Sequence, residues 1–190
     1  MADLLRLSAD IIDGKASLEQ TGPLNRINHQ LSELNKDLAV VEAFSHCLVF
    51  TTDDGLVTFD TSNEQGGSKC VEAIRGWSKD PFNTVVFTHG HIDHAGSLAL
   101  LQEEWDVPTY LPKKERVLFD TLPMQGSMFG MPHLNRPCGR VDHEIEDGFE
   151  IMLGQTQLKF ISTPGHTPGQ GCWYDANDII VGDTLFAGSI

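Results

Sequence analysis

The chain has 190 residues, 40% of them hydrophobic, which is enough to bury the core of one domain. Its 27 acidic side chains outnumber the 13 basic ones, and the formal net charge of -14 disfavours binding to a nucleic-acid backbone. No apolar run reaches the length of a membrane span, so we expect neither a nucleic-acid nor a membrane partner. The four cysteines form no C-x-x-C pair, which is typical of reduced cysteines and favours a cytoplasmic location.

The first 37 residues carry a weak pattern. Apolar residues at 4, 5, 7, 11 and 12 predict a short amphipathic segment, which Gly14 interrupts. Ile27, Leu31 and Leu34 are spaced as in a turn or two of helix. We interpret 1–37 as an N-terminal appendage that packs on the fold or on a second subunit, with a loose leader as the alternative.

From residue 38 onward the chain alternates between predicted strands and helices. Apolar runs at 39–44 and 47–51 are followed by Asp53-Asp54-Gly55 and a return run at 56–60, which predicts a hairpin. A helix at 68–77, a strand at 84–87, a helix at 95–105 and a strand at 107–110 follow. This alternation predicts an α/β fold, and 38–190 is the predicted main domain.

Three histidines and an aspartate gather in the loop that follows the strand at 84–87. The stretch Thr88–Gly96 places His89, His91, Asp93 and His94 after a buried, β-branched run, where open α/β sheets keep ligand sites. Neutral imidazoles and carboxylates hold zinc or non-haem iron while leaving a position open for water. His89 and His91 can face one ion, and Asp93 and His94 can face a second one.

The remaining chain contains a long irregular segment and then four more predicted strands. Residues 112–147 include prolines and the apolar residues Met124, Met128, Phe129 and Met131, which predicts a loop that acts as an insertion or lid, or that packs on a neighbouring subunit. We regard His133 and His143 in this segment as surface residues. Strands are expected at 149–153, 157–161, 171–174 and 178–183. His166 lies between two of them on a loop stiffened by proline and glycine, and Asp183 ends the last one.

Three stretches together resemble the metallo-β-lactamase-fold hydrolases: 88–96, 163–169 and 182–186. The resemblance runs from residue 38 to the C-terminus and implies an αββα sandwich with its metal ions at one edge. It implies that His89, His91 and His166 bind one ion, and that Asp93, His94 and Asp183 bind another, with Asp183 bridging the two. It also implies that Asp60 lies just behind the histidine loop and orients it by hydrogen bonds, a cap on the following turn being the alternative.

The resemblance further implies a metallo-hydrolase that uses metal-activated hydroxide on a small-molecule ester, thioester, lactone or sulfate ester. Two zinc ions are expected, with iron and manganese as alternatives, and Asp93 is the candidate for moving a proton. A persulfide dioxygenase with one iron at His89, His166 and Asp183 is the second interpretation. A metal-binding scaffold or fragment without turnover is the third.

One departure from the family pattern concerns the second ion. A further histidine is expected well downstream of the bridging aspartate, but this sequence stops at Ile190. We therefore expect a domain truncated at its C-terminus, with a second site that depends on a ligand from elsewhere. Exposed sheet in such a domain favours association into a homo-oligomer.

Overall fold

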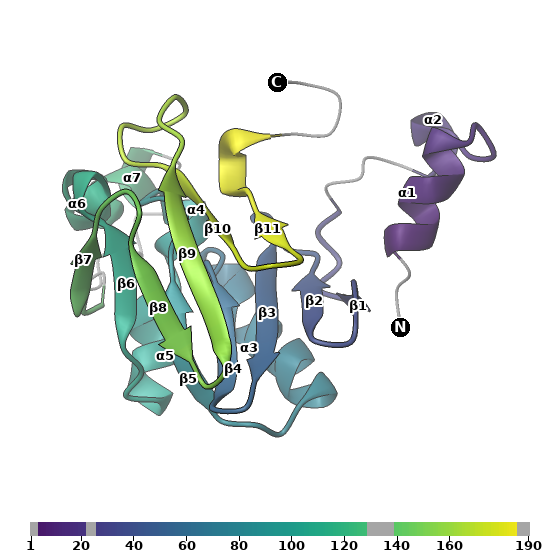
Figure 1. Cartoon of the computed structure of the whole chain (residues 1–190). Coiled ribbons are helices and arrows are strands. Elements are labelled where there is room, and N and C mark those ends of the chain that lie inside the picture. Colours follow the sequence, from purple (N-terminus) through teal and green to yellow (C-terminus); the bar gives the residue numbers. More distant parts are fainter. Residues whose placement is uncertain (1–3, 22–25, 129–138, 186–190) are drawn as a thin grey trace.

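The computed structural model describes residues 4–21, 26–128 and 139–185. Two β-sheets pack face to face, and helices cover the outer face of the larger sheet (Figure 1). The larger sheet follows chain order: β1 (Leu31–Glu33), β2 (Leu38–Val41), β3 (Cys47–Thr52), β4 (Gly55–Phe59), β5 (Phe82–Val86), β6 (Thr109–Pro112) and β7 (His143–Ile145). The smaller sheet has the order β11 (Ile179–Ile180), β10 (Gly171–Tyr174), β9 (Thr156–Ser162) and β8 (Glu150–Leu153).

Strand direction in the larger sheet places the polar loops of the histidine region at one edge. Strands β1 to β4 are antiparallel neighbours, and the predicted hairpin is confirmed by the pairing of Thr52 with Gly55. Strands β4 to β7 are parallel neighbours. Because parallel strands end at the same edge, the residues that follow β4, β5 and β6 come together there. These residues include Asp60, Thr88 and Glu115.

Two hydrophobic cores hold the layers together. One lies between the larger sheet and its helices and contains Val85, Ile74 and Leu98. The other lies between the sheets, where Phe59, Phe160 and Trp173 pack. Trp173 is fully buried, and its indole N–H donates to the carbonyl of Phe87 across the sheets at 3.0 Å. This contact fixes the smaller sheet against the strand that leads into the histidine loop.

The helices are short apart from one. The longest is α3 (Glu64–Trp77), which begins where the Asn63 side chain accepts a hydrogen bond from the N–H of Gly66. The others are α1 (Leu4–Ile12), α2 (Leu18–Thr21), α4 (Ile92–Ala95), α5 (Leu98–Glu104), α6 (Arg116–Asp120) and α7 (Leu122–Met128), with 3-10 turns η1 (Lys113–Glu115) and η2 (Gly182–Thr184). Within the described ranges, every helix is too short or too polar to traverse a bilayer.

The structure differs from the sequence-based expectation at four places. The strand expected at 178–183 is only Ile179–Ile180, and Asp183 lies in the turn η2 that follows it. Leu31 belongs to a strand instead of a helical turn, because pairing with β2 outweighs the helical spacing of its apolar neighbours. The helix expected at 95–105 is interrupted between α4 and α5. The segment 112–147, expected to be a loop, contains η1, α6, α7 and β7. The boundary at residue 38 and the lid role remain predictions, and Phe129, Met131, His133 and Cys138 lie outside the described residues.

Candidate metal centre

His89 is the most buried of the predicted ligands. It follows β5 directly through Phe87 and Thr88, and none of its surface is exposed. Its Nδ1 lies 3.1 Å from the Thr88 hydroxyl, whereas its Nε2 is buried and has no hydrogen-bond partner in the protein. Leaving a buried polar atom without a partner costs about 1–3 kcal/mol, so such an atom calls for an explanation. A metal ion at Nε2 provides one.

His91 and His166 converge on the same point from different loops. The Nδ1 of His91 lies 3.1 Å from the Nε2 of His166, although 75 positions separate the two residues in sequence. Together with His89 they form what we call the three-histidine cluster, whose ligand atoms all lie within 4.8 Å of one another. Nitrogen ligands on a tetrahedral zinc ion lie about 3.3 Å apart. The spacing of His91 and His166 therefore suits a shared ion.

His94 and Asp183 form a second group with His89, which we call the mixed cluster. The Nε2 of His94 lies 3.3 Å from Oδ1 of Asp183, and the other carboxylate oxygen, Oδ2, lies 3.5 Å from the Nε2 of His166. Asp183 thus belongs to the mixed cluster and also approaches the three-histidine cluster, as a bridging ligand would. Asp93 belongs to neither cluster, although its Oδ2 is 3.6 Å from the Nε2 of His94.

The turn that carries Asp183 approaches the histidine loop very closely. Gly182 adopts a φ of 50°, and a Cβ there would lie 2.6 Å from the Thr88 hydroxyl oxygen. Only glycine suits both the left-handed backbone and this approach. Thr184, which follows Asp183, has its hydroxyl 2.8 Å from that of Thr163 and accepts a 2.8 Å hydrogen bond from the Gln170 amide. These contacts tie Asp183 to the loop that carries His166.

The electrostatics of the two clusters differ. Burial, followed by repulsion from His94, lowers the pKa of His89 to about 2, so His89 is a neutral imidazole that offers a lone pair. Burial also lowers the pKa of His94, but Asp60, Asp183 and Asp93 outweigh it and raise the value to about 10. Burial raises the pKa of Asp183, but its hydrogen bond with His94 and its attraction to His94, His89 and His166 together outweigh burial, so the net shift is downward. The mixed cluster therefore attracts positive charge, which a divalent cation supplies.

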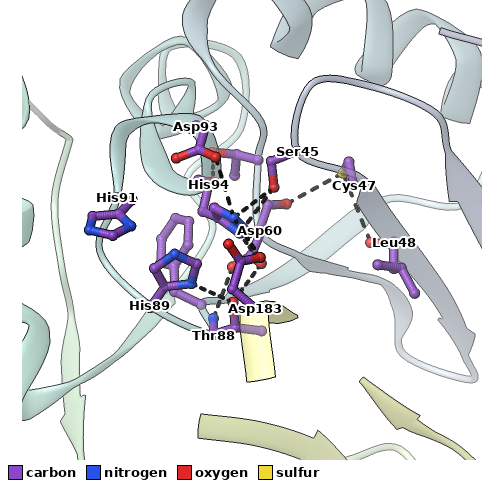
Figure 2. A network of polar contacts seen from close by, with 12 residues as sticks. Ser45, Cys47, Leu48, Asp60, Thr88, His89, His91, Asp93, His94 and Asp183 are labelled. Atoms are coloured by element: carbon purple, nitrogen blue, oxygen red, sulfur yellow. Dashed lines mark hydrogen bonds and ion pairs between the residues drawn. The ribbon is translucent and has the colours of Figure 1, made fainter. Parts of the chain in front are cut away.

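Asp60 supports the histidine loop from behind, as the sequence interpretation expected. Its Oδ1 accepts the backbone N–H of Thr88 at 2.9 Å, and its Oδ2 accepts the Thr88 hydroxyl at 2.7 Å (Figure 2). The same Oδ2 lies 2.8 Å from the Nδ1 of His94. Ser45, which the sequence did not single out, places its hydroxyl 3.0 Å from each ring nitrogen of His94. Its position in a loop before β3 gave no signal of this contact.

A cavity of about 560 Å³ adjoins the mixed cluster. Asp93, His94 and Asp183 line one part of it, and apolar side chains line another, among them Phe44, Leu48 and Ile179. None of the described residues between 112 and 147 lines this cavity. Its apolar lining therefore comes from β3, β11, the residues beside them and Leu4 of α1, and not from the segment that the sequence interpretation assigned to it.

Comparison with known proteins agrees with this geometry. Residues 40–190 match the family model described as the metallo-beta-lactamase superfamily. The chain is 34% identical over 154 residues to the probable metallo-hydrolase YqgX of Bacillus subtilis, with 79% of this chain and 69% of that protein covered. It is 31% identical over 163 residues to the hydroxyacylglutathione hydrolase GloC of Haemophilus influenzae, with 83% and 74% covered.

Solved structures share the fold at lower identity. The BJP-1 subclass B3 metallo-beta-lactamase of Bradyrhizobium japonicum matches with a TM-score of 0.68 and 23% identity over 80% of this chain. This chain covers 60% of that lactamase and 56% of an uncharacterised protein from Aquifex aeolicus that is 40% identical over 126 residues. The predicted α/β sandwich is thereby confirmed. The family-model match covers most of the chain, and the chain belongs to the metallo-beta-lactamase superfamily.

Proposed function

We propose that this chain carries the metal centre of a hydrolase that cleaves an ester or thioester of a small carboxylic acid, with zinc as the metal. The observation that carries the proposal is the buried Nε2 of His89, which has no hydrogen-bond partner and belongs to both clusters. The donor set of imidazoles and carboxylates fits zinc. Relatives named hydroxyacylglutathione hydrolases favour a thioester among the candidate esters.

In this proposal each residue has a defined task. His89, His91 and His166 hold one ion, while Asp93, His94 and Asp183 hold the other. Zinc held by these residues would lower the pKa of a coordinated water and would draw electron density from the bond under attack. Asp93 is half-buried and lines the cavity, so its carboxylate is placed to take up or return a proton there. The apolar wall formed by Phe44, Leu48 and Ile179 receives the acyl part of the substrate.

The test begins with metal analysis of protein purified without chelator or added metal. About two zinc ions per chain, together with hydrolysis of a hydroxyacylglutathione thioester and of p-nitrophenyl acetate, are the expected result. One ion per chain would remove the second site from the proposal. Zinc without turnover of either compound would favour a metal-binding scaffold, and bound iron with colour would favour the dioxygenase alternative. A metal-free chain that does not take up zinc would contradict the metal centre itself.

A further inference from the structure

Glu115 is a fully buried carboxylate that touches both histidine loops. Its Oε2 accepts the backbone N–H of Gly90 at 2.8 Å, and its Oε1 accepts that of Gly169 at 2.6 Å. Gly90 lies between His89 and His91, and Gly169 belongs to the loop that carries His166. One side chain from η1 therefore joins the two segments that contribute the three-histidine cluster.

Both glycines lie too close to the Glu115 segment to accept a larger residue. A Cβ on Gly90 would be 3.0 Å from the carbonyl oxygen of Glu115 and 3.1 Å from the backbone nitrogen of Phe119. A Cβ on Gly169 would be 2.7 Å from Oε1 of Glu115 and 2.8 Å from the Cβ of Lys114. The short hydrogen bonds depend on this close backbone approach. The two glycines and the carboxylate therefore form one fitted contact.

The chemistry of the contact requires a carboxylate of this length. Burying a charged carboxylate is costly unless hydrogen bonds compensate for lost hydration. An ionised carboxylate offers two accepting oxygens, one for each glycine, whereas the amide of glutamine offers one accepting oxygen and a donor group. Aspartate keeps the charge but is one methylene shorter. Neither replacement is able to accept hydrogen bonds from both loops without movement of one loop.

A second hydrogen bond also joins the two loops, at a point further from the ligand atoms. The N–H of Gly171 donates to the carbonyl of Thr88 at 3.1 Å, where β10 begins beside the end of β5. This bond joins the bases of the two loops, and Glu115 joins them beside the histidines. Loss of Glu115 should therefore leave the sheets assembled while the ligand-bearing parts of the loops separate. Its effect is expected on the metal site more than on the fold.

We propose that Glu115 is a positioning residue that sets the separation of His91 and His166 and thereby the metal affinity of the three-histidine cluster. The proposal rests on the metal centre proposed above. It assigns a role in that centre to the Lys113–Glu115 turn, which lies outside both ligand loops. Residues that orient metal ligands in this way typically change metal affinity about 10–100-fold when replaced.

The first test compares zinc dissociation constants of Glu115→Gln, Glu115→Asp and the unchanged protein, by competition with a chromophoric chelator. Both variants should bind zinc at the tighter site about 10–100-fold more weakly. In the cobalt-loaded protein, the visible bands should change in both. Glu42→Gln is the matched control: Glu42 is also fully buried, but its carboxylate binds Arg26 and Asn28 instead of a histidine loop. It should lose stability and keep the zinc affinity.

A second pair of variants leaves Glu115 in place. Gly169→Ala pushes the His166 loop away from the carboxylate and should weaken zinc binding even if Glu115→Gln fails to fold. Gly165→Ala is the control. Gly165 lies in the same loop, but a Cβ there meets nothing within 4 Å, so this variant should bind zinc normally.

Unchanged zinc affinity in Gly169→Ala or in folded Glu115→Gln would overturn the proposal. Normal affinity in Glu115→Asp would also overturn it, because charge alone would then suffice. Failure of the unchanged protein to bind zinc would instead refute the metal centre.

Discussion

The Nδ1 atom of His94 lies 2.8 Å from Oδ2 of Asp60, at the end of β4. Because a carboxylate only accepts hydrogen bonds, this contact places a proton on Nδ1 and turns Nε2 toward Asp183, 3.3 Å away. The same carboxylate holds the backbone and hydroxyl of Thr88. One side chain thus sets both the ring orientation of His94 and the start of the histidine loop.

Replacing Asp60 with Asn should weaken metal binding at the mixed cluster about 10–100-fold, because the amide has a single accepting oxygen for three donor groups, the N–H and hydroxyl of Thr88 and Nδ1 of His94. Asparagine suits the φ of 60° at this position, so backbone strain should contribute little. Metal titration followed by elemental analysis measures the effect. Asp80→Asn is the control and should bind metal normally. Asp80 is an exposed carboxylate that precedes the first residue of β5, whereas the histidine loop follows the last residue of that strand. Equal affinities for the two variants would contradict the role of Asp60.

His89→Ala and His166→Ala should each remove bound metal and hydrolytic activity together. Both residues are assigned to the first ion, so each replacement should release that ion. Because His89 also lies close to His94 and Asp183, its loss should in addition weaken binding of the second ion. Metal content per chain and thioester turnover are the measurements. His143→Ala is the control, because His143 is exposed and stacks on Tyr110 in the neighbouring strand. Full metal content in either cluster variant would show that its ligand assignment is wrong.

Removal of metal should lower the thermal stability of the protein. A ligand that binds only the folded state at 100 times its dissociation constant adds about 2.7 kcal/mol, which is about 5–10 °C for a chain of this size. Thermal unfolding with and without a chelator, followed by restoration with zinc, measures the difference. An unfolding temperature that does not respond to either treatment would contradict metal binding by the folded chain.

Two glycines in α3 should respond in opposite directions to alanine. At Gly67 a Cβ would lie 1.9 Å from the hydroxyl of Ser97, so Gly67→Ala should destabilise the protein by about 1–3 kcal/mol. At Gly76 a Cβ meets nothing within 4 Å, so Gly76→Ala should stabilise it by up to about 1 kcal/mol through helix propensity. Urea unfolding of both variants measures this. Similar changes in the two would mean that α3 does not pack closely against Ser97.

Local patterns predicted the parts of the fold that depend on neighbours in sequence. The Asp54-Gly55 turn predicted the hairpin, and the β-branched run at 84–87 predicted β5 and the loop that follows it. The strand Leu31–Glu33 was missed because its identity depends on pairing with β2. The spacing of a few apolar residues does not show which strand they will pair with.

The supports of the candidate site were harder to predict than its ligands. The residue type and spacing of the histidines are enough to predict them as ligands. Glu115, in contrast, lies in the charged run Lys113-Lys114-Glu115-Arg116, which resembles an exposed turn. Its burial arises only when the loops of Gly90 and Gly169 close over it. Asp60 was easier, since the resemblance to the metallo-β-lactamase-fold hydrolases implied that it lies just behind the histidine loop.

The order of the ligands along the chain bears on how the protein matures in a cell. The candidate ligands begin at His89 and end at Asp183, and the residues that orient them begin at Asp60. A growing polypeptide has no complete cluster until both later loops have been synthesised and the two sheets have packed. Metal loading is thus expected only after Asp183 has been synthesised and the two sheets have packed, so the ions should bind a chain that is already largely folded.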